Sequence, residues 1–192
     1  MGPAIATAPV CSVPVPGIAK VLGCCLLVAL AAQVRIPVPG TDVPLTLQST
    51  AVLLCGFALC PGEAALAMVL YVLGGASGMP LFAPGSGGVL GSTGGYIVGF
   101  IPAAWLVSVL RGSGAASFGR LFIAGAAGTG VIFVLGALWP WRVALYGGNV
   151  GMSVTTGVVP FAVKAVVQLS LAVTLVASVR GLRRRRTGSA VL

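Results

Sequence analysis

A chain of 192 residues with 58% hydrophobic and only 7% charged side chains is not a soluble domain, because such domains carry about 25% charged residues. Its apolar runs are continuous rather than alternating, which predicts membrane helices and argues against a membrane β-barrel. The formal net charge is +9, but the basic residues gather at the ends of the apolar runs. This pattern indicates membrane topology rather than nucleic-acid binding.

The N-terminal part of the chain predicts an irregular segment followed by a first span. Residues 1–17 are rich in Pro, Ala and Val, and we expect an irregular cytoplasmic N-terminus there. The apolar run over residues 18–34 predicts a membrane helix. Ala19 and Gly23 are small residues four apart on this helix. A second helix could therefore approach closely at this face, either from within the bundle or from a partner.

Two further spans are expected before a long glycine-rich stretch. Residues 35–46 contain three prolines and predict extended backbone rather than helix. Apolar runs over residues 47–59 and 64–73 predict the second and third spans. Residues 71–96 contain nine glycines and no charged side chain. This stretch is either a flexible connector or a wall that packs closely against a ligand.

The C-terminal half predicts three more spans, over residues 94–110, 121–138 and 160–179. A short polar loop is expected over residues 111–120 and a longer loop over residues 139–159. A basic tail, residues 181–192, closes the chain. The predicted organisation is one all-α, polytopic membrane domain of six transmembrane helices over residues 18–180, between the irregular N-terminus and the tail.

The distribution of Lys and Arg predicts which side of the membrane each end faces. With the N-terminus inside, the inner segments carry eight basic residues: Lys20, Arg111, Arg120, Arg180, Arg183, Arg184, Arg185 and Arg186. The outer segments carry only Arg35 and Arg142. This bias follows the positive-inside rule and predicts that both termini are cytoplasmic. The long connections 35–46, 74–93 and 139–159 then share the outer face, which favours a small-molecule site capped from outside.

Lys164 lies inside the sixth predicted span and is the strongest candidate for a functional residue. A charged side chain within a membrane helix costs about 3 kcal/mol and marks a functional site by default. Its ammonium either reaches the nearby outer interface or pairs with an anionic or carbonyl group of a ligand. Neutral polar residues gather near the outer ends of the spans: Thr46, Gln48, Ser92, Thr93, Tyr96 and Asn149. They either cap helices and contact interfacial water, or bind a ligand with amide- or urea-like groups and an apolar part.

The sequence argues against an enzyme. It contains no histidine and only two carboxylates, Asp42 and Glu63, so neither a catalytic acid–base pair nor a metal site is expected. The motif G-x-x-x-x-G-K-[ST] is missing, so the chain is not expected to hydrolyse ATP by that route. We therefore predict no catalytic residue, no metal and no cofactor.

The order of several motifs resembles the BioY family, the biotin-binding S components of energy-coupling-factor (ECF) transporters. The matching segments fall within residues 18–180: Ala32-Gln33, Ile36-Pro37-Val38-Pro39, Val43 to Gln48, Tyr71 to Phe82, Gly87-Gly88, Gly91 to Tyr96, and Pro160-Phe161 ahead of Lys164. Each segment alone is a weak signal, whereas their combination in this order is specific.

This resemblance implies a multi-pass protein of the bacterial plasma membrane that captures biotin at its outer face. It adds Gly91 to the expected biotin site and implies that the face with Ala19 and Gly23 docks partner subunits. Those partners would be a transmembrane T component and a pair of ATPases that supply the energy for uptake. The alternatives are an S component for a different small vitamin and a structural membrane subunit without transport.

Two positions depart from the pattern of the family that the chain resembles. Ser92 stands where the family often has a proline before Thr-Gly-Gly-Tyr. Phe161 stands where the family usually has an aspartate three residues before the lysine. That aspartate would accept hydrogen bonds from the ureido N–H groups of biotin. Gln48 and Asn149 are the neutral residues expected to act as acceptors instead.

Overall fold

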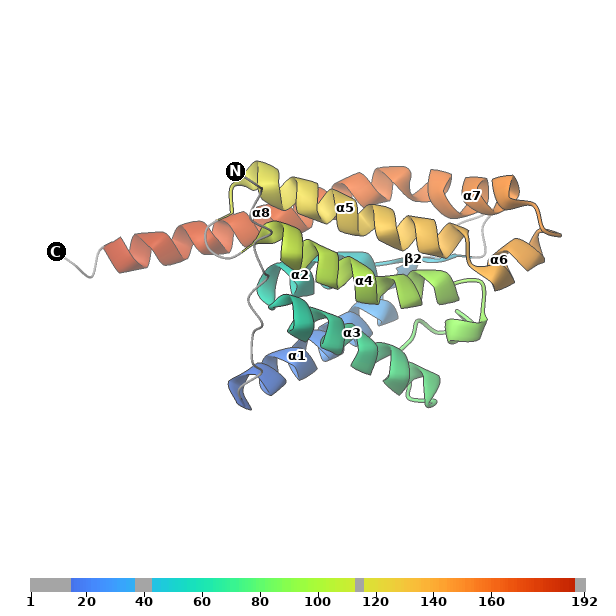
Figure 1. The fold of residues 1–192 in the computed structure, drawn as a ribbon, viewed down its shortest axis with the longest axis horizontal. Coiled ribbons are helices and arrows are strands. Elements are labelled where there is room, and N and C mark those ends of the chain that lie inside the picture. Colours follow the sequence, from blue (N-terminus) through green and yellow to red (C-terminus); the bar gives the residue numbers. More distant parts are fainter. Residues whose placement is uncertain (1–14, 37–42, 113–115, 189–192) are drawn as a thin grey trace, which may run out of the picture.

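The computed structural model describes residues 15–36, 43–112 and 116–188, which form a bundle of helices with one small antiparallel ladder (Figure 1). The ladder consists of β1 (Arg35–Ile36) and β2 (Leu45–Thr46). The helices are α1 (Val15–Gln33), α2 (Gln48–Ala58), α3 (Pro61–Ala76), η1 (Gly88–Leu90), α4 (Gly94–Arg111), α5 (Phe118–Ala137), α6 (Pro140–Leu145), α7 (Val150–Val158), η2 (Val159–Phe161) and α8 (Ala162–Gly188). The predicted all-α class is confirmed.

Helices occupy each of the six ranges in which spans were expected. Within the part of the chain that the structure describes, three segments are long and apolar enough to cross a bilayer, namely α4, α5 and the continuous stretch Val150–Val179. The helices α2, α3 and the part of α1 from Gly17 to Gln33 are apolar but shorter. Large apolar side chains remain exposed along α1, α5 and α8, as expected where helices face lipid.

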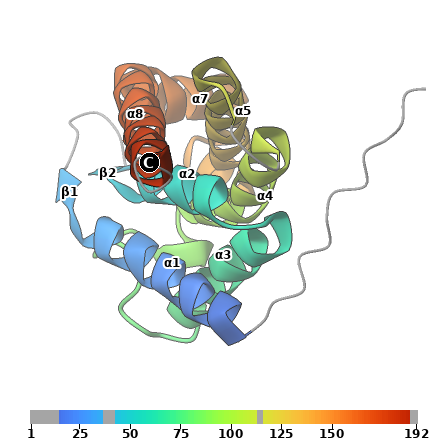
Figure 2. The ribbon, with the colours of Figure 1, turned by 90° about the vertical axis from the view of Figure 1, so that its left-hand side faces the viewer.

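The helices α2 and α4 occupy the middle of the bundle, with α1 and α3 on one side and α5 and α8 on the other (Figure 2). Fully buried side chains such as Val52 and Tyr71 fill the space between them. Small residues let the helices approach closely, since a Cβ at Gly56 in α2 would lie 2.9 Å from the carbonyl oxygen of Ala104 in α4. Close backbone approach between small residues is the usual way to pack helices in lipid.

The proline-rich connection is extended where the structure describes it. β1 pairs with β2 in antiparallel register, with Arg35 opposite Thr46. The Arg35 guanidinium donates to the carbonyl oxygen of Pro84 and so ties the ladder to the glycine-rich stretch. Residues 37–42 lie outside the described residues. The ladder leads directly into α2, which places Thr46 and Gln48 side by side at the start of that helix.

The prediction of a loop over residues 139–159 is wrong. This segment forms α6 and α7, and α7 continues through η2 into α8. Its glycines and threonines have low helix propensity, but two contacts offset this. Asn149 caps the first turn by accepting from the backbone N–H of Met152 at 3.0 Å. Ser153 is fully buried, and its hydroxyl donates to the carbonyl oxygen of Ala137 in α5 at 2.6 Å.

Other boundaries also differ from the predicted ones. α3 continues into the expected loop as far as Ala76, and the glycines there make room for Phe82, whose ring would lie 2.3 Å from a Cβ at Gly75. Residues 15–17 belong to α1 rather than to an irregular N-terminus, and residues 1–14 lie outside the described residues. α8 extends to Gly188 through most of the expected tail, because arginine is a good helix former.

Gly95 at the start of α4 is expected to be essential for packing against α5. A Cβ there would lie 2.3 Å from the carbonyl oxygen of Leu135 and 3.0 Å from the Cα of Gly136. Because these are backbone atoms, Gly95→Ala should force the helices apart and cost about 1–3 kcal/mol. The matched control is Gly119→Ala in α5, where a Cβ would meet nothing within 4 Å. Thermal unfolding in detergent should show a lower midpoint for Gly95→Ala only; equal midpoints would contradict this packing.

Candidate ligand-binding site

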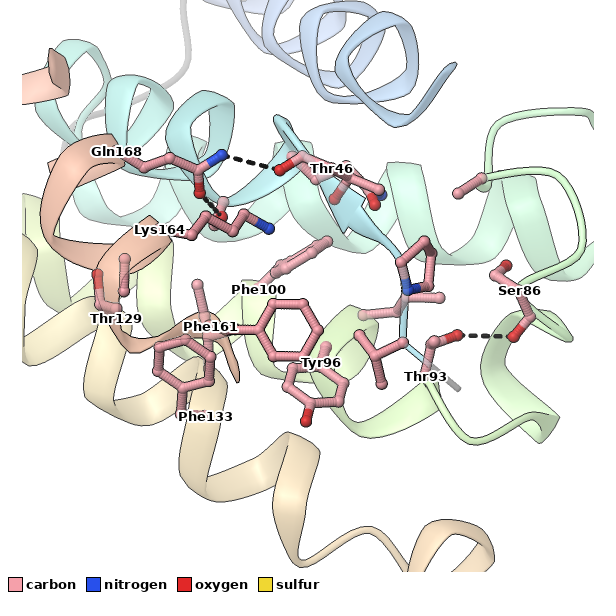
Figure 3. Close-up of a pocket in the computed structure, with 18 of the residues that line it drawn as sticks. Thr46, Ser86, Thr93, Tyr96, Phe100, Thr129, Phe133, Phe161, Lys164 and Gln168 are labelled. Atoms are coloured by element: carbon pink, nitrogen blue, oxygen red, sulfur yellow. Dashed lines mark hydrogen bonds between the residues drawn. The ribbon is translucent and has the colours of Figure 1, made fainter. Parts of the chain in front are cut away.

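A cavity of about 70 Å³ lies between the β2–α2 junction, the start of α4, the middle of α5 and the start of α8 (Figure 3). One buried water needs about 10–15 Å³, so the cavity has room for more than a single water. Its wall consists of Val43, Pro44, Thr46, Gln48, Ser49, Leu53, Ala83, Ser86, Thr93, Tyr96, Ile97, Phe100, Thr129, Ile132, Phe133, Phe161, Lys164, Ala165 and Gln168. The glycine-rich stretch thus supplies part of this wall.

Lys164 is the one charged side chain among the described residues that line this cavity. Its ammonium points toward the middle of the cavity (Figure 3) and lies 5.5 Å from the centre of the Phe161 ring. A cation over an aromatic face is weakly stabilised by the ring quadrupole. Of the two carboxylates in the sequence, Asp42 lies outside the described residues. Glu63 accepts from the backbone N–H of Cys60 at the start of α3. The described part of the wall therefore supplies a positive charge and no negative one.

Gln168 joins α8 to the β2–α2 junction through two hydrogen bonds. Its amide nitrogen donates to the carbonyl oxygen of Thr46 at 2.8 Å, and its amide oxygen accepts from the Ser49 hydroxyl at 2.6 Å. The side chain is 7% exposed. Gln168 follows Lys164 by one helical turn, so the two side chains share a face of α8. The amide clamp thereby fixes the wall of the cavity beside the ammonium.

Aromatic rings and hydrogen-bonded side chains form the rest of the wall. Tyr96 donates its hydroxyl to the carbonyl oxygen of Gly157 at 2.9 Å, so its ring rather than its hydroxyl faces the cavity (Figure 3). Thr93 donates to the carbonyl oxygen of Ser86 at 2.7 Å. The amide nitrogen of Gln48 donates to the Tyr71 hydroxyl. These contacts hold the wall in place and leave mostly apolar surface toward the cavity.

The structure brings together five of the eight residues predicted to bind substrate. Thr46, Gln48, Thr93, Tyr96 and Lys164 line the cavity. The other three lie outside its wall. A Cβ at Gly91 would lie 2.7 Å from the carbonyl oxygen of Ser86, so Gly91 permits a tight backbone contact behind the wall. Ser92 is half-buried next to it, and Asn149 is exposed and caps α7.

Sequence reasoning missed several residues of the wall, above all Gln168. The sequence pattern that could have identified Gln168 is a second polar side chain four residues after Lys164 on an apolar helix, which places both side chains on one face. Ser49 was missed because it directly follows Gln48 within the same turn. Phe100 and Phe133 carry no such signal, since nothing in their apolar runs distinguishes the face toward a cavity from the face toward lipid.

The Gln168 clamp is expected to stabilise the bundle even without ligand. Gln168→Leu removes both hydrogen bonds but keeps the Thr46 carbonyl and the Ser49 hydroxyl, which lose this amide at a cost of about 1–3 kcal/mol. The matched control is Ser170→Ala, an exposed position on the same helix. The thermal midpoint of the ligand-free protein should fall for Gln168→Leu and stay unchanged for Ser170→Ala. An unchanged midpoint for both variants would contradict a stabilising clamp.

The fold and the cavity can be compared with known proteins. A model of the BioY family matches residues 7–185. The chain belongs to the BioY family. It is 34% identical over 158 residues to the "Probable biotin transporter BioY" of Pyrococcus horikoshii, covering 81% of this chain and 90% of that one. It is 36% identical over 138 residues to the "Biotin transporter BioY" of Thermotoga maritima, covering 70% of this chain and 78% of that one.

A solved structure supports the same family at the level of the fold. The chain superposes on the S-component for biotin from an ECF-type ABC transporter with a TM-score of 0.75, 18% sequence identity, and coverage of 87% of this chain and 92% of that one. The fold is thus that of an S-component membrane protein. The resemblance to the BioY family drawn from sequence motifs is confirmed. The expectation that the chain is not an enzyme is confirmed as well, since its relatives are named as transporters.

Proposed function

We propose that this BioY family member is the biotin-binding S component of an ECF transporter, and that the cavity around Lys164 is its biotin site. The observation that carries the proposal is the composition of the cavity wall. It combines one ammonium with four aromatic rings, those of Tyr96, Phe100, Phe133 and Phe161, and with the amide of Gln48. Such a wall suits a ligand with an apolar ring and chain and a few strong hydrogen-bonding groups.

The proposed contacts divide biotin into an apolar body and polar ends. The rings of Tyr96 and Phe100 pack against its fused rings and aliphatic chain. Lys164 donates to a carbonyl or carboxylate oxygen of the ligand, a charge-assisted hydrogen bond. Phe161 replaces the acidic residue expected from the family pattern, so the ureido N–H groups need another acceptor, and the Gln48 amide oxygen takes this role. Thr46 and Thr93 contribute at the rim, while Gly91, Ser92 and Asn149 support the wall from behind.

Biotin binding requires this wall to open. The cavity of about 70 Å³ is smaller than the about 300–1,000 Å³ of typical small-molecule sites. Lys164 is half-buried and has a long, flexible side chain, so its rotation toward the cavity mouth widens the space. We propose that the structure described here corresponds to a contracted, ligand-free arrangement.

Six spans with both termini in the cytoplasm agree best with the distribution of charge. The start of α1, the end of α4, the start of α5 and the end of α8 share one end of the bundle (Figure 1). These segments include Lys20, Arg111 and Arg120. Positive charge favours the cytoplasmic side, so the start of α4 and the Lys164 cavity face outward. The protein then lies in a bacterial plasma membrane and collects its ligand from outside.

Uptake requires partners that supply energy, because the sequence has no phosphate-binding motif of the G-x-x-x-x-G-K-[ST] type. A transmembrane T component and a pair of ATPases fill this role in the proposal. Ala19 and Gly23 of α1 are exposed, and a Cβ at Gly23 would meet nothing within 4 Å. We propose this open face of α1 as the docking surface for the T component.

Competition binding tests the choice of vitamin. Purified protein is loaded with radiolabelled biotin and challenged with equal concentrations of unlabelled biotin, thiamine or riboflavin. Only unlabelled biotin is expected to displace the label. Displacement by thiamine or riboflavin at similar concentrations would support an S component for another vitamin. Failure to retain any of the three vitamins would support a structural membrane subunit instead.

A further inference from the structure

A second, larger hollow lies at the opposite end of the bundle from the Lys164 cavity. Its volume is about 860 Å³, and it shares no wall residue with the first cavity. Its floor is the last two turns of α2, and its sides are α1 and α8, which stand on either side of α2 (Figure 2). We call it the basal groove and define it by Gly23 and Leu27 of α1, Leu54 and Phe57 of α2, and Leu175 and Val179 of α8.

The basal groove is open beside Gly23 of α1. A Cβ at Gly23 would meet nothing within 4 Å, and Lys20 one turn before it is exposed. Apart from its basic rim, the groove is lined by Leu, Val, Phe, Ala, Gly and Cys side chains. Water gains few hydrogen bonds against such walls. In a bilayer the natural occupant of an open apolar groove is an acyl chain.

The rim of the basal groove is basic. Lys20 and Arg111 belong to its wall, and the described residues that line it include no carboxylate. The guanidinium of Arg111 donates to the carbonyl oxygen of Leu59 at 3.2 Å, which holds it at the end of α2. Lys and Arg near a membrane surface attract anionic headgroups. Charge complementarity therefore favours a lipid with a negative headgroup over a neutral one.

The direction of the basal groove matches that of a phospholipid. Lys20 lies near the start of α1, while Leu27 lies seven residues, or about 10 Å, further along the helix. Arg111 and Val179 lie at the same end as Lys20, and Leu54 and Leu175 lie deeper. The charged rim therefore stands at the membrane surface and the apolar part runs toward the middle of the bilayer.

We infer that the basal groove binds one anionic phospholipid, with its phosphate at Lys20 and Arg111 and an acyl chain between α1, α2 and α8. The site is separate from the ligand cavity and does not depend on which vitamin that cavity takes. Because Gly23 opens into the groove, a partner helix that docks on this part of α1 must displace the lipid. The lipid is thus bound to the subunit only when no partner helix is docked on α1.

Native mass spectrometry of the purified full-length protein in a neutral detergent tests this site. The probes are phosphatidylglycerol and phosphatidylcholine with identical acyl chains. The wild type is expected to retain one phosphatidylglycerol in a saturable manner. It should bind this lipid about five-fold more tightly than phosphatidylcholine, which is the effect of roughly one Lys or Arg on an anionic headgroup. Lys20→Gln should remove most of this preference. The matched control Lys164→Gln has the same net charge as Lys20→Gln and should keep the preference for phosphatidylglycerol.

A second pair of variants tests where the acyl chain lies. Gly23→Leu places a side chain in the open space of the basal groove and should abolish retention of both lipids. Gly119→Leu, at a glycine where a Cβ likewise meets nothing within 4 Å, should retain them. Equal binding of both lipids with no effect of Lys20→Gln, or full retention by Gly23→Leu, would overturn the proposal. A lipid-free dimer dissociated by Gly23→Leu would place a second copy of the chain in the groove instead.

Discussion

Replacing Lys164 with alanine is expected to weaken biotin binding by about 10- to 100-fold, measured by isothermal titration of the purified protein. The ammonium points into the proposed site (Figure 3), and a hydrogen bond to a charged group contributes about 1.5–3 kcal/mol. Lys164→Met keeps most of the length and the apolar contacts of the side chain. It should lose nearly as much affinity, because the charge rather than the packing carries the effect.

Two comparisons make the Lys164 result specific. Lys20→Ala removes an equal charge at the opposite end of the bundle and should leave the affinity for biotin unchanged. Biotin methyl ester should bind much more weakly than biotin if the ammonium pairs with the carboxylate, and about equally if it pairs with the ureido oxygen. Unchanged affinity in Lys164→Ala would mean that the lysine only reaches toward the membrane interface.

Bulky residues on the open face of α1 are expected to prevent assembly with the T component and ATPases while sparing biotin binding. The variant is the double substitution Ala19→Leu with Gly23→Leu. Both positions are exposed, so the fold should tolerate it. Overpacking at a helix contact costs about 1–3 kcal/mol, which corresponds to about 5- to 150-fold weaker association. Co-purification of the partners on an affinity-tagged subunit measures this directly.

The control for the assembly experiment is Ala162→Leu, an exposed position on α8 that should leave co-purification intact. Ala19→Leu alone separates docking from lipid binding, because Ala19 is not part of the basal groove wall. Parallel loss of biotin binding and of partner binding in the double variant would indicate misfolding. Normal co-purification would move the docking surface away from α1.

The fold could be predicted from the sequence to the extent that hydrophobicity decides it. Long apolar runs located α1, α4, α5 and α8, and prolines predicted the extended backbone that flanks α2. The helix α7 could not be predicted in this way. Its glycines and threonines are poor helix formers, and it is stabilised by the buried hydrogen bond from Ser153 to α5. That contact depends on how the helices pack and leaves no local pattern in the sequence.

The site could be predicted only in part, because the partners of a polar side chain also depend on how the helices pack. Charge inside a membrane helix is rare, so Lys164 stood out without any structure. Asn149 was polar and near the expected outer face, but the structure uses it as a helix cap. Gln168 was overlooked although it forms the two hydrogen bonds of the clamp. Polarity thus indicates that a side chain needs partners, and only the packing tells whether these are backbone, neighbours or ligand.

An experimental structure of the protein with bound biotin tests the proposed site most directly. We expect biotin between α2, α4 and α8, with an oxygen within hydrogen-bond distance of the Lys164 ammonium and its rings against Tyr96 and Phe100. We also expect the cavity to have a larger volume than the about 70 Å³ of the contracted arrangement. Biotin bound in the basal groove, or bound without contact to Lys164, would contradict it.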